Sequence, residues 1–374
     1  MINSPIVLTG FGSVSAFGPH RGLLAPASVD LQVISRWPTR GARRARLVPR
    51  FRASDVVPGL KTRRMDRLSV WALVAASLAL EDARFEPESS GDHDRTAVIL
   101  GTAFGCLDMT EEFLLSITRH GPAMADPILF PETLSNLPAG HVARHFGLRG
   151  PNVTLSCGGL SAEAALGEAM AQMLCGETDV AVVMAGDLLS RALFEWYEAA
   201  SLLAPECFEV PGRHARRNAF VPGEGLGVVV IETADGAAAR GVTPYAQIHS
   251  LRLEHVSESR SGDADPGDAA DWFRRVTLSG IDPARVRLVA AMRDQAGGAG
   301  PRQHSLERFV SPASFGTCTV SGYTGEFWSG GLVGLALALG HASSGTSGFV
   351  LAVSTDPGGA RSTLALWFDE GSRR

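Results

Sequence analysis

Lysine and long apolar runs are nearly absent from this sequence of 374 residues. Lys61 is its single lysine, so arginine supplies the positive charge, and the net charge is −5. That balance argues against a basic surface for nucleic acid, and we expect no DNA or RNA partner. No segment approaches the ~20 apolar residues of a membrane-spanning helix, and the N-terminus lacks the pattern of a secretory leader. We therefore predict a cytoplasmic protein with no membrane partner.

Cysteine is scarce as well. The five cysteines are widely spaced and contain no C-x-x-C pair, which argues against a disulfide framework and against a structural zinc site. His141 and His145 are four residues apart, but no carboxylate pattern accompanies them, and we assign both to the scaffold. We expect no metal and no cofactor.

Short apolar runs alternate with helical patterns along the chain. Helical spacing of apolar residues occurs at Leu68 to Ala83, Leu160 to Leu174 and Leu332 to Leu339. Between them lie runs typical of strands that are buried on both faces. These runs are Ile6 to Thr9, Ala97 to Leu100, Val180 to Ala185, Gly227 to Ile231, Val286 to Ala291, Phe349 to Val353 and Leu364 to Trp367. The alternation predicts an α/β protein.

A small, polar, turn-prone stretch at residues 233–245 divides the chain. We predict an N-terminal half at residues 1–235 and a shorter C-terminal half at residues 245–374. The arginine-rich segment 36–50 and the polar segment 257–270 lack apolar periodicity, and we predict that both are exposed loops.

Several motifs occur in a fixed order in the first 232 residues. They are V-L-T-G-F-G near the start, R-R-M-D-R at 63–67, G-T-A-F-G at 101–105, D-P-I-L-F-P at 126–131, T-L-S-C-G-G at 154–159 and V-P-G-E-G-L-G at 221–227. Together they resemble the β-ketoacyl synthase (ketosynthase) family, and the second half resembles it less closely. The resemblance implies a thiolase-type fold, in which two related βαβαβαββ halves form a layered αβαβα architecture and the protein is a dimer.

The resemblance also places the family's catalytic residues on this chain. The nucleophilic cysteine falls on Gly159, the two histidines fall on Met292 and Glu326, and the lysine falls on Ser321. A ketosynthase needs a thiolate at a helix N-terminus, where the dipole and free N–H groups stabilise it. Glycine supplies no nucleophile, and a thioether donates no hydrogen bond. We therefore expect no family catalytic residue in this chain.

Cys157 keeps an enzymatic alternative open. It lies two residues before Gly159, and its thiol could reach the same helix end. The chain would then be an active acyltransferase or condensing enzyme with Cys157 as nucleophile and Glu326 as general base. The opposing interpretation is a small thiol that packs as an ordinary apolar group.

Inactive family members of this kind include the chain-length factor, or ketosynthase β subunit, of type II polyketide and aryl-polyene synthases. The resemblance then implies an active ketosynthase partner in a heterodimer and an acyl carrier protein, while a homodimeric acyl-binding module is a third possibility. Residues matching the acyl tunnel or interface are Phe104, Ile128, Leu129 and Phe130, and those matching the carrier-protein contact are Arg63 and Arg64.

Overall fold

The structure is a computed structural model that describes residues 4–25, 27, 29–39, 41–86, 92–207, 219–255, 279–292, 316–324, 327–342, 347–355, 360–369 and 371–373. Within these ranges, eleven strands form one mixed sheet in the order β11-β10-β12-β13-β9-β1-β8-β7-β5-β6, with β2 (Gly18–Arg21) paired to β1. The other ten strands belong to two sets of five.

The two sets have the same topology. The first set is β1 (Ile6–Ser15), β5 (Thr96–Gly101), β6 (Asn152–Leu155), β7 (Val180–Asp187) and β8 (Gly225–Thr233). The second set is β9 (Ala246–His255), β10 (Val286–Ala291), β11 (Gly316–Thr319), β12 (Gly348–Thr355) and β13 (Ala360–Phe368). In each set the spatial order is first, fifth, fourth, second, third, with two antiparallel pairings followed by two parallel ones. β1 pairs with β9 and joins the sets.

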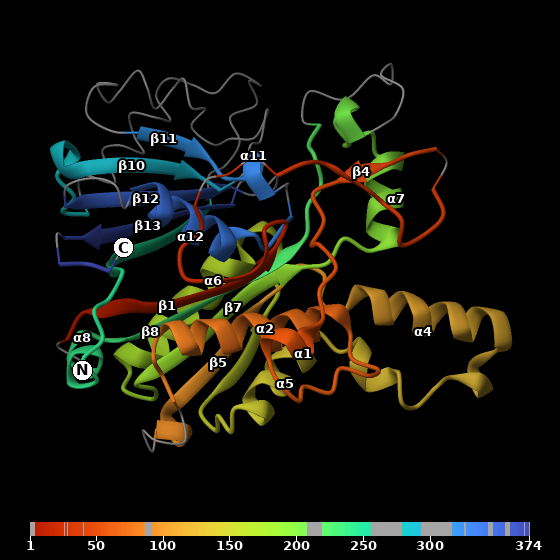
Figure 1. The fold of residues 1–374 in the computed structure, drawn as a ribbon, viewed down its shortest axis with the longest axis horizontal. Coiled ribbons are helices and arrows are strands. Elements are labelled where there is room, and N and C mark those ends of the chain that lie inside the picture. Colours follow the sequence, from red (N-terminus) through yellow and green to blue (C-terminus); the bar gives the residue numbers. More distant parts are fainter. Residues whose placement is uncertain are drawn as a thin grey trace.

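Helices cover the sheet in layers. α6 (Ser161–Leu174) and α12 (Gly331–Ala342) lie between the strands of the two sets, and each occupies the same place in its own half (Figure 1). A single apolar cluster unites these helices with strands of both sets. α2 (Arg67–Asp82) and α5 (Leu137–His145) pack on the outer face of the first set in a second cluster. The described residues thus supply four successive layers.

Glycine in the first strand allows the outer layer to pack closely. A Cβ at Gly12 would overlap the backbone carbonyl of Ala75 in α2. A side chain at Gly12 would therefore push the helix away from the strand. This contact gives a physical reason for the T-G-F-G motif.

The chain between β5 and β6 projects from the layered body. It contains α4 (Leu107–His120), η2 (Pro122–Met124) and η3 (Phe130–Thr133), and Figure 1 shows α4 extending away from the sheet. None of the described residues of α4 is buried in the single chain. We call residues 107–134 the projecting unit.

The remaining described elements are short. They are β3 (Gln32–Val33), β4 (Arg44–Ala45), α1 (Ala53–Val56), η1 (Asp92–Arg95), η4 (Gly158–Leu160), α7 (Arg191–Ala199), η5 (Pro205–Cys207), α8 (Ala234–Ala239), η6 (Pro283–Arg285) and α11 (Ser321–Thr324). Among the described helices, none combines the length and apolarity needed to span a membrane.

The prediction that segment 36–50 is an exposed loop was wrong. Ala45 and Leu47 are buried, β4 pairs with β3, and the Arg43 guanidinium binds Glu198 at 2.7 Å. Arg36 binds the fully buried carboxylate of Glu224. Arginine enters this region because carboxylates distant in sequence compensate its charge. The other segment, 257–270, lies outside the described residues.

Candidate functional site

The chain turns sharply between β6 and α6. The hydroxyl of Ser161 accepts a hydrogen bond from the Cys157 N–H at 3.0 Å and donates one to the Gly158 carbonyl at 2.8 Å. Gly158 has φ +57°, a conformation that glycine adopts without strain. These bonds shape the segment 156–160, which we call the elbow, and Gly159 lies buried in it at the start of the helix. Gly158 and Gly159 thus leave the middle of the elbow without side chains.

Cys157 occupies the outer side of the elbow. Its side chain is exposed, and it precedes the single helical turn η4 rather than belonging to α6. The thiol is therefore accessible to reagents. Gly159, in contrast, is buried.

Met292 lies at the end of β10, and the structure brings it to the start of α6. Its backbone N–H donates to the Val353 carbonyl at 2.9 Å, and its side chain is buried. Met292, Ala162 and Glu163 line a cavity of about 10 Å³, which is room for one water at most. Ser321 is the first residue of α11, while Glu326 lies outside the described residues.

Glu163 is a site residue that the sequence analysis missed. It lies in the first turn of α6, is buried, and accepts a hydrogen bond from the Ser354 hydroxyl at the end of β12. A Cβ at Gly331 would lie 2.8 Å from its Oε1 atom, so α12 begins directly against this carboxylate. An acidic residue inside an Ala-rich buried helix was the signal that could have identified it.

Asp187, at the end of β7, is the second missed residue. Only 1% of its surface is exposed. Its Oδ1 accepts three hydrogen bonds, from the Thr102 hydroxyl at 2.9 Å, the Ala103 N–H at 2.9 Å and the Phe104 N–H at 3.1 Å. Its Oδ2 accepts the Ser329 N–H at 2.8 Å. Burial raises the pKa of Asp187, and these donors oppose the rise. One carboxylate thus holds loop 102–105 and the turn before α12.

Loop 102–105 also rests on the elbow. The Ser156 hydroxyl donates to the Ala103 carbonyl at 3.2 Å, and the Thr102 N–H donates to the Leu155 carbonyl at 3.0 Å. The half-buried ring of Phe104 meets the ring of Trp328 edge to face, with 5.7 Å between centroids. The elbow, the loop and the turn before α12 therefore form one connected site.

The other residues assigned to the tunnel lie on the projecting unit. Ile128 and Phe130 are each 52% exposed, and Leu129 is half-buried. The ring of Phe130 contacts the ring of Phe113 in α4, with 5.7 Å between their centroids. The structure therefore separates Phe104, whose ring packs on Trp328, from Ile128 and Phe130, which are exposed on the projecting unit.

A groove with basic residues lies beside the start of α2. It has a volume of about 380 Å³, and Lys61, Arg144 and His145 contribute to its lining. Arg63 and Arg64 are exposed in the segment that follows Lys61. His141 also lines the groove but is buried, with Nε2 3.2 Å from Glu132 Oε1, which fits the scaffold role predicted for it.

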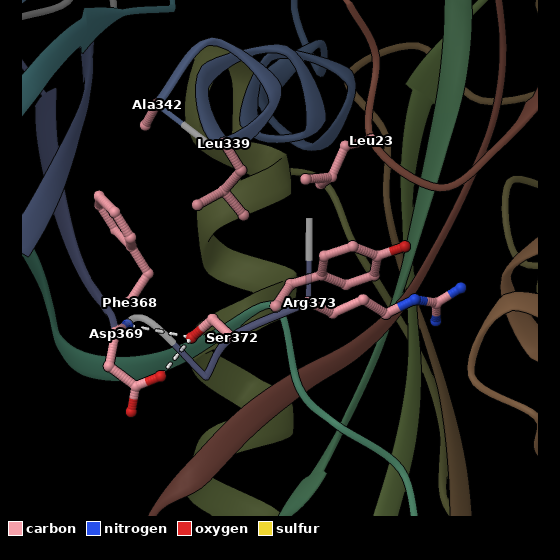
Figure 2. A pocket seen from close by; sticks show the side chains of 8 residues that line it. Leu23, Leu339, Ala342, Phe368, Asp369, Ser372 and Arg373 are labelled. Atoms are coloured by element: carbon pink, nitrogen blue, oxygen red, sulfur yellow. Dashed lines mark hydrogen bonds between the residues drawn. The ribbon is translucent and has the colours of Figure 1, made fainter. Parts of the chain in front are cut away.

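A small cavity near the C-terminal end involves none of these residues. Leu23, Leu339, Phe368 and Arg373 line its volume of about 20 Å³ (Figure 2). The Arg373 guanidinium donates to the buried Asp82 carboxylate at 2.7 Å, which ties this end to α2. We assign this cavity to packing. Among the described residues, no group of three or more His, Cys, Asp or Glu side chains could hold a metal ion.

Comparison with known proteins identifies relatives of the chain. Residues 42–237 match the family described as "Beta-ketoacyl synthase, N-terminal domain". The 3-oxoacyl-(acyl-carrier-protein) synthase 2 of Rhizobium meliloti is 31% identical over 64% of this chain and 59% of its own length. The protein of the same name from Vibrio cholerae is 26% identical over 91% of this chain and 78% of its own length. The match thus spans less than two thirds of the first relative.

Solved structures share the fold. One described as "The ishigamide ketosynthase/chain length factor" is 24% identical, with a TM-score of 0.75 over 98% of this chain and 99% of its own. A β-ketoacyl synthase from Burkholderia phymatum is 19% identical, with a TM-score of 0.77 over 97% and 99%. A type II PKS acyl-carrier protein in complex with its ketosynthase is 18% identical, with a TM-score of 0.76 over 97% and 99%. The predicted thiolase-type α/β fold is thereby confirmed.

Proposed function

This chain belongs to the β-ketoacyl synthase family, and we propose that it is a non-catalytic subunit of the chain-length-factor type. It pairs with an active ketosynthase and shapes the tunnel that holds the growing acyl chain. The observation that carries this proposal is Gly159, which is buried in the elbow at the start of the helix and on which the family's nucleophile falls by the resemblance of the surrounding motif.

The surroundings of Gly159 are also unsuited to condensation. A helix N-terminus favours anions, but the carboxylate of Glu163 already lies in the first turn of α6. It would oppose a thiolate or an oxyanion at this helix end through like charge. Met292, on which a family histidine falls by the resemblance, has a buried side chain that offers no hydrogen-bond donor. Both features support a structural subunit.

The projecting unit supports the ketosynthase partner. Large apolar side chains on it are between 40% and 64% exposed, namely Leu114, Leu115, Met124, Ile128, Phe130 and Leu134. Such a concentration of exposed apolar groups marks a protein interface. A related subunit with the same fold is the occupant we propose, in agreement with the structural neighbour that is described as a ketosynthase/chain length factor.

The basic groove supports contact with an acidic carrier protein. Lys61, Arg144 and His145 line it, and exposed Arg63 and Arg64 are adjacent in sequence to its rim. Clustered positive charge steers an acidic partner to the surface. One structural neighbour is described as a ketosynthase in complex with an acyl-carrier protein, which supports this kind of partner.

A second function, an acyltransferase that uses Cys157, is favoured by the exposure of that thiol at the elbow. Intact mass spectrometry after incubation with acyl-loaded carrier protein separates the two. We expect no adduct. A stable acyl adduct that is absent from Cys157→Ala would show that the chain is an enzyme and not a structural subunit.

Copurification tests the partner. The tagged chain is expressed in its own host, and bound proteins are identified by mass spectrometry; we expect a ketosynthase that retains its cysteine and both histidines. Phe130→Asp should abolish this association, because it places a charge in the apolar interface. Trp196→Asp is the matched control, since Trp196 is also 52% exposed but belongs to α7. Equal retention of the ketosynthase by both variants would contradict the proposed interface.

A further inference from the structure

The projecting unit begins against the start of α2, where one carboxylate caps two helices. Asp66 is the N-cap residue of α2, and its Oδ1 atom accepts the Leu68 N–H at 2.7 Å. Its Oδ2 atom accepts the N–H of Met109, in the first turn of α4, at 3.2 Å. The N-cap residue of α4 itself, Cys106, makes no side-chain capping bond. α4 therefore obtains its cap from a residue outside the projecting unit.

Two carboxylates of the projecting unit face this shared cap. Glu132 in η3 accepts the backbone N–H of Asp66 at 3.3 Å. Asp108 in α4 precedes Met109, and its charge raises the pKa of Asp66. Asp66 is completely buried, so water screens this repulsion poorly. A negative charge on Asp66 therefore opposes the contact between α2 and the projecting unit.

Arginine compensates these carboxylates only in part. Arg67 donates its Nε–H to Asp108 at 2.5 Å, and its Nη1 donates to the buried Glu224 carboxylate at 3.2 Å. Arg36 also binds Glu224, at a distance of 2.5 Å. Arg67 is thus the cation beside Asp66, and its charge is already shared between two other carboxylates.

His141 and Cys106 add no charge to this cluster. Arg144 donates to His141 Nδ1 at 3.0 Å, so this nitrogen is an acceptor, and the Nε2–H of the neutral ring donates to Glu132 at 3.2 Å. Burial raises the pKa of the Cys106 thiol, which therefore stays protonated at neutral pH. Loss of a proton from Asp66 would thus leave an uncompensated charge where the projecting unit meets α2.

We infer that a proton on the Asp66 carboxyl group holds the projecting unit against α2, so that Asp66 is a positioning residue for the partner interface. The consequence for the partner rests on the proposed function, which makes this unit the contact with a ketosynthase. Protonation removes the charge that faces Asp108 and Glu132. The shorter of the two capping bonds, to Leu68, can persist because it needs only the oxygen that stays unprotonated.

The direction of the pH dependence follows from the two environments of Asp66. While the unit is attached, burial raises the pKa of Asp66 from 3.8 to about 7; the Asp108 charge adds to the rise, and the bond from Met109 opposes it less strongly. When the unit moves away and water reaches the carboxyl group, this pKa returns toward about 4. Attachment therefore takes up a proton. It is firmest below about pH 4 and weakens as the pH rises through about 7.

Amide hydrogen exchange of the chain alone, followed by mass spectrometry of α4 peptides, measures how often the unit opens. The rates are divided by those of free amides at the same pH, so that only opening remains. From pH 6 to pH 8 we expect the opening constant of wild type to rise about tenfold, because the proton leaves Asp66. In Asp66→Asn, which cannot ionise, the constant should be equal at both pH values. It should exceed the wild-type value at pH 6, because the amide NH₂ then faces the Met109 N–H.

Asp126→Asn is the matched control. Asp126 lies within the projecting unit, and its Oδ1 atom accepts the Ile128 N–H at 2.8 Å, which is a local bond inside the unit. This variant should keep the wild-type response of about tenfold. Should Asp66→Asn not fold, Asp66→Ser replaces it, because serine is a good N-cap residue and carries no charge.

Two results would overturn the inference. One is an opening constant of wild-type α4 that is equal at pH 6 and pH 8, and the other is a wild-type pH response that persists in Asp66→Asn or Asp66→Ser. Addition of the ketosynthase that copurifies tests the proposed function separately, since a partner on the projecting unit should slow exchange in α4. If added ketosynthase slows exchange but pH and the Asp66 variants do not change opening, the inference fails and the proposed interface stands. If opening follows Asp66 but added ketosynthase leaves exchange unchanged, the proposed interface fails, and with it the consequence for the partner.

Discussion

Asp187 provides a sharp test of how the site is held together. In Asp187→Asn, the single amide oxygen would remain with its three donors from residues 102–104, which places the amide NH₂ against the Ser329 N–H. One charge-assisted hydrogen bond is then replaced by two donors that face each other in a buried place. Losing such a bond costs roughly 1.5–3 kcal/mol.

A compensating effect reduces this cost. Burial raises the pKa of Asp187, which means that the wild-type carboxylate is partly destabilised by its own desolvation, and neutral asparagine avoids that penalty. We therefore expect Asp187→Asn to lower the free energy of unfolding by about 2 kcal/mol at pH 7, near the lower part of that range.

Urea denaturation followed by circular dichroism measures this difference. Asp179→Asn is the control, because the Asp179 side chain is 45% exposed and pairs with Arg95 on the surface. Exposed ion pairs contribute about 0–1 kcal/mol. If the two variants lose the same small amount of stability, the claim that Asp187 holds both loops is refuted.

Three further predictions concern other described residues. Burial raises the pKa of Asp66 from its usual value of 3.8 to about 7. The folded state therefore binds the Asp66 proton more tightly than the unfolded state does, and the free energy of unfolding falls as pH rises from about 4 to 7. Asp66→Asn should flatten this pH dependence in urea titrations at several pH values. Gly101→Ala should lower the free energy of unfolding by about 3 kcal/mol, because the new Cβ would overlap the first carbonyl of α6. In the same assay Gly140→Ala should raise it by up to about 1 kcal/mol, because a Cβ there would have no other atom within 4 Å. Iodoacetamide at pH 8 should label exposed Cys157 far faster than buried Cys207, as peptide mapping would show. Burial raises the pKa of Cys207 to about 12, so about one Cys207 thiol in ten thousand is ionised at pH 8. Equal labelling of the two cysteines would contradict the burial of Cys207.

The strands of the fold were predictable where they are apolar throughout. All seven predicted runs lie within strands of the sheet, and the three predicted helices correspond to α2, α6 and α12. β6 and β9 were missed because most of their side chains are exposed or half-buried, and α4 because it has no buried face in the single chain. The periodicity of apolar residues in a sequence reflects which side chains are buried. Elements at the surface or at an interface therefore show only a weak periodic pattern.

The sequence by itself determined that glycine stands at position 159 of the elbow, where we propose that the family's nucleophile is missing, because the elbow is built from neighbouring residues. Tertiary structure alone decided what surrounds it. Asp187 reaches donors 83 to 85 residues earlier and 142 residues later in the chain, and Glu163 meets Ser354 across 191 residues. Contacts at such separations depend on how the two halves pack, and a buried carboxylate is tolerated there because packing brings its donors to it.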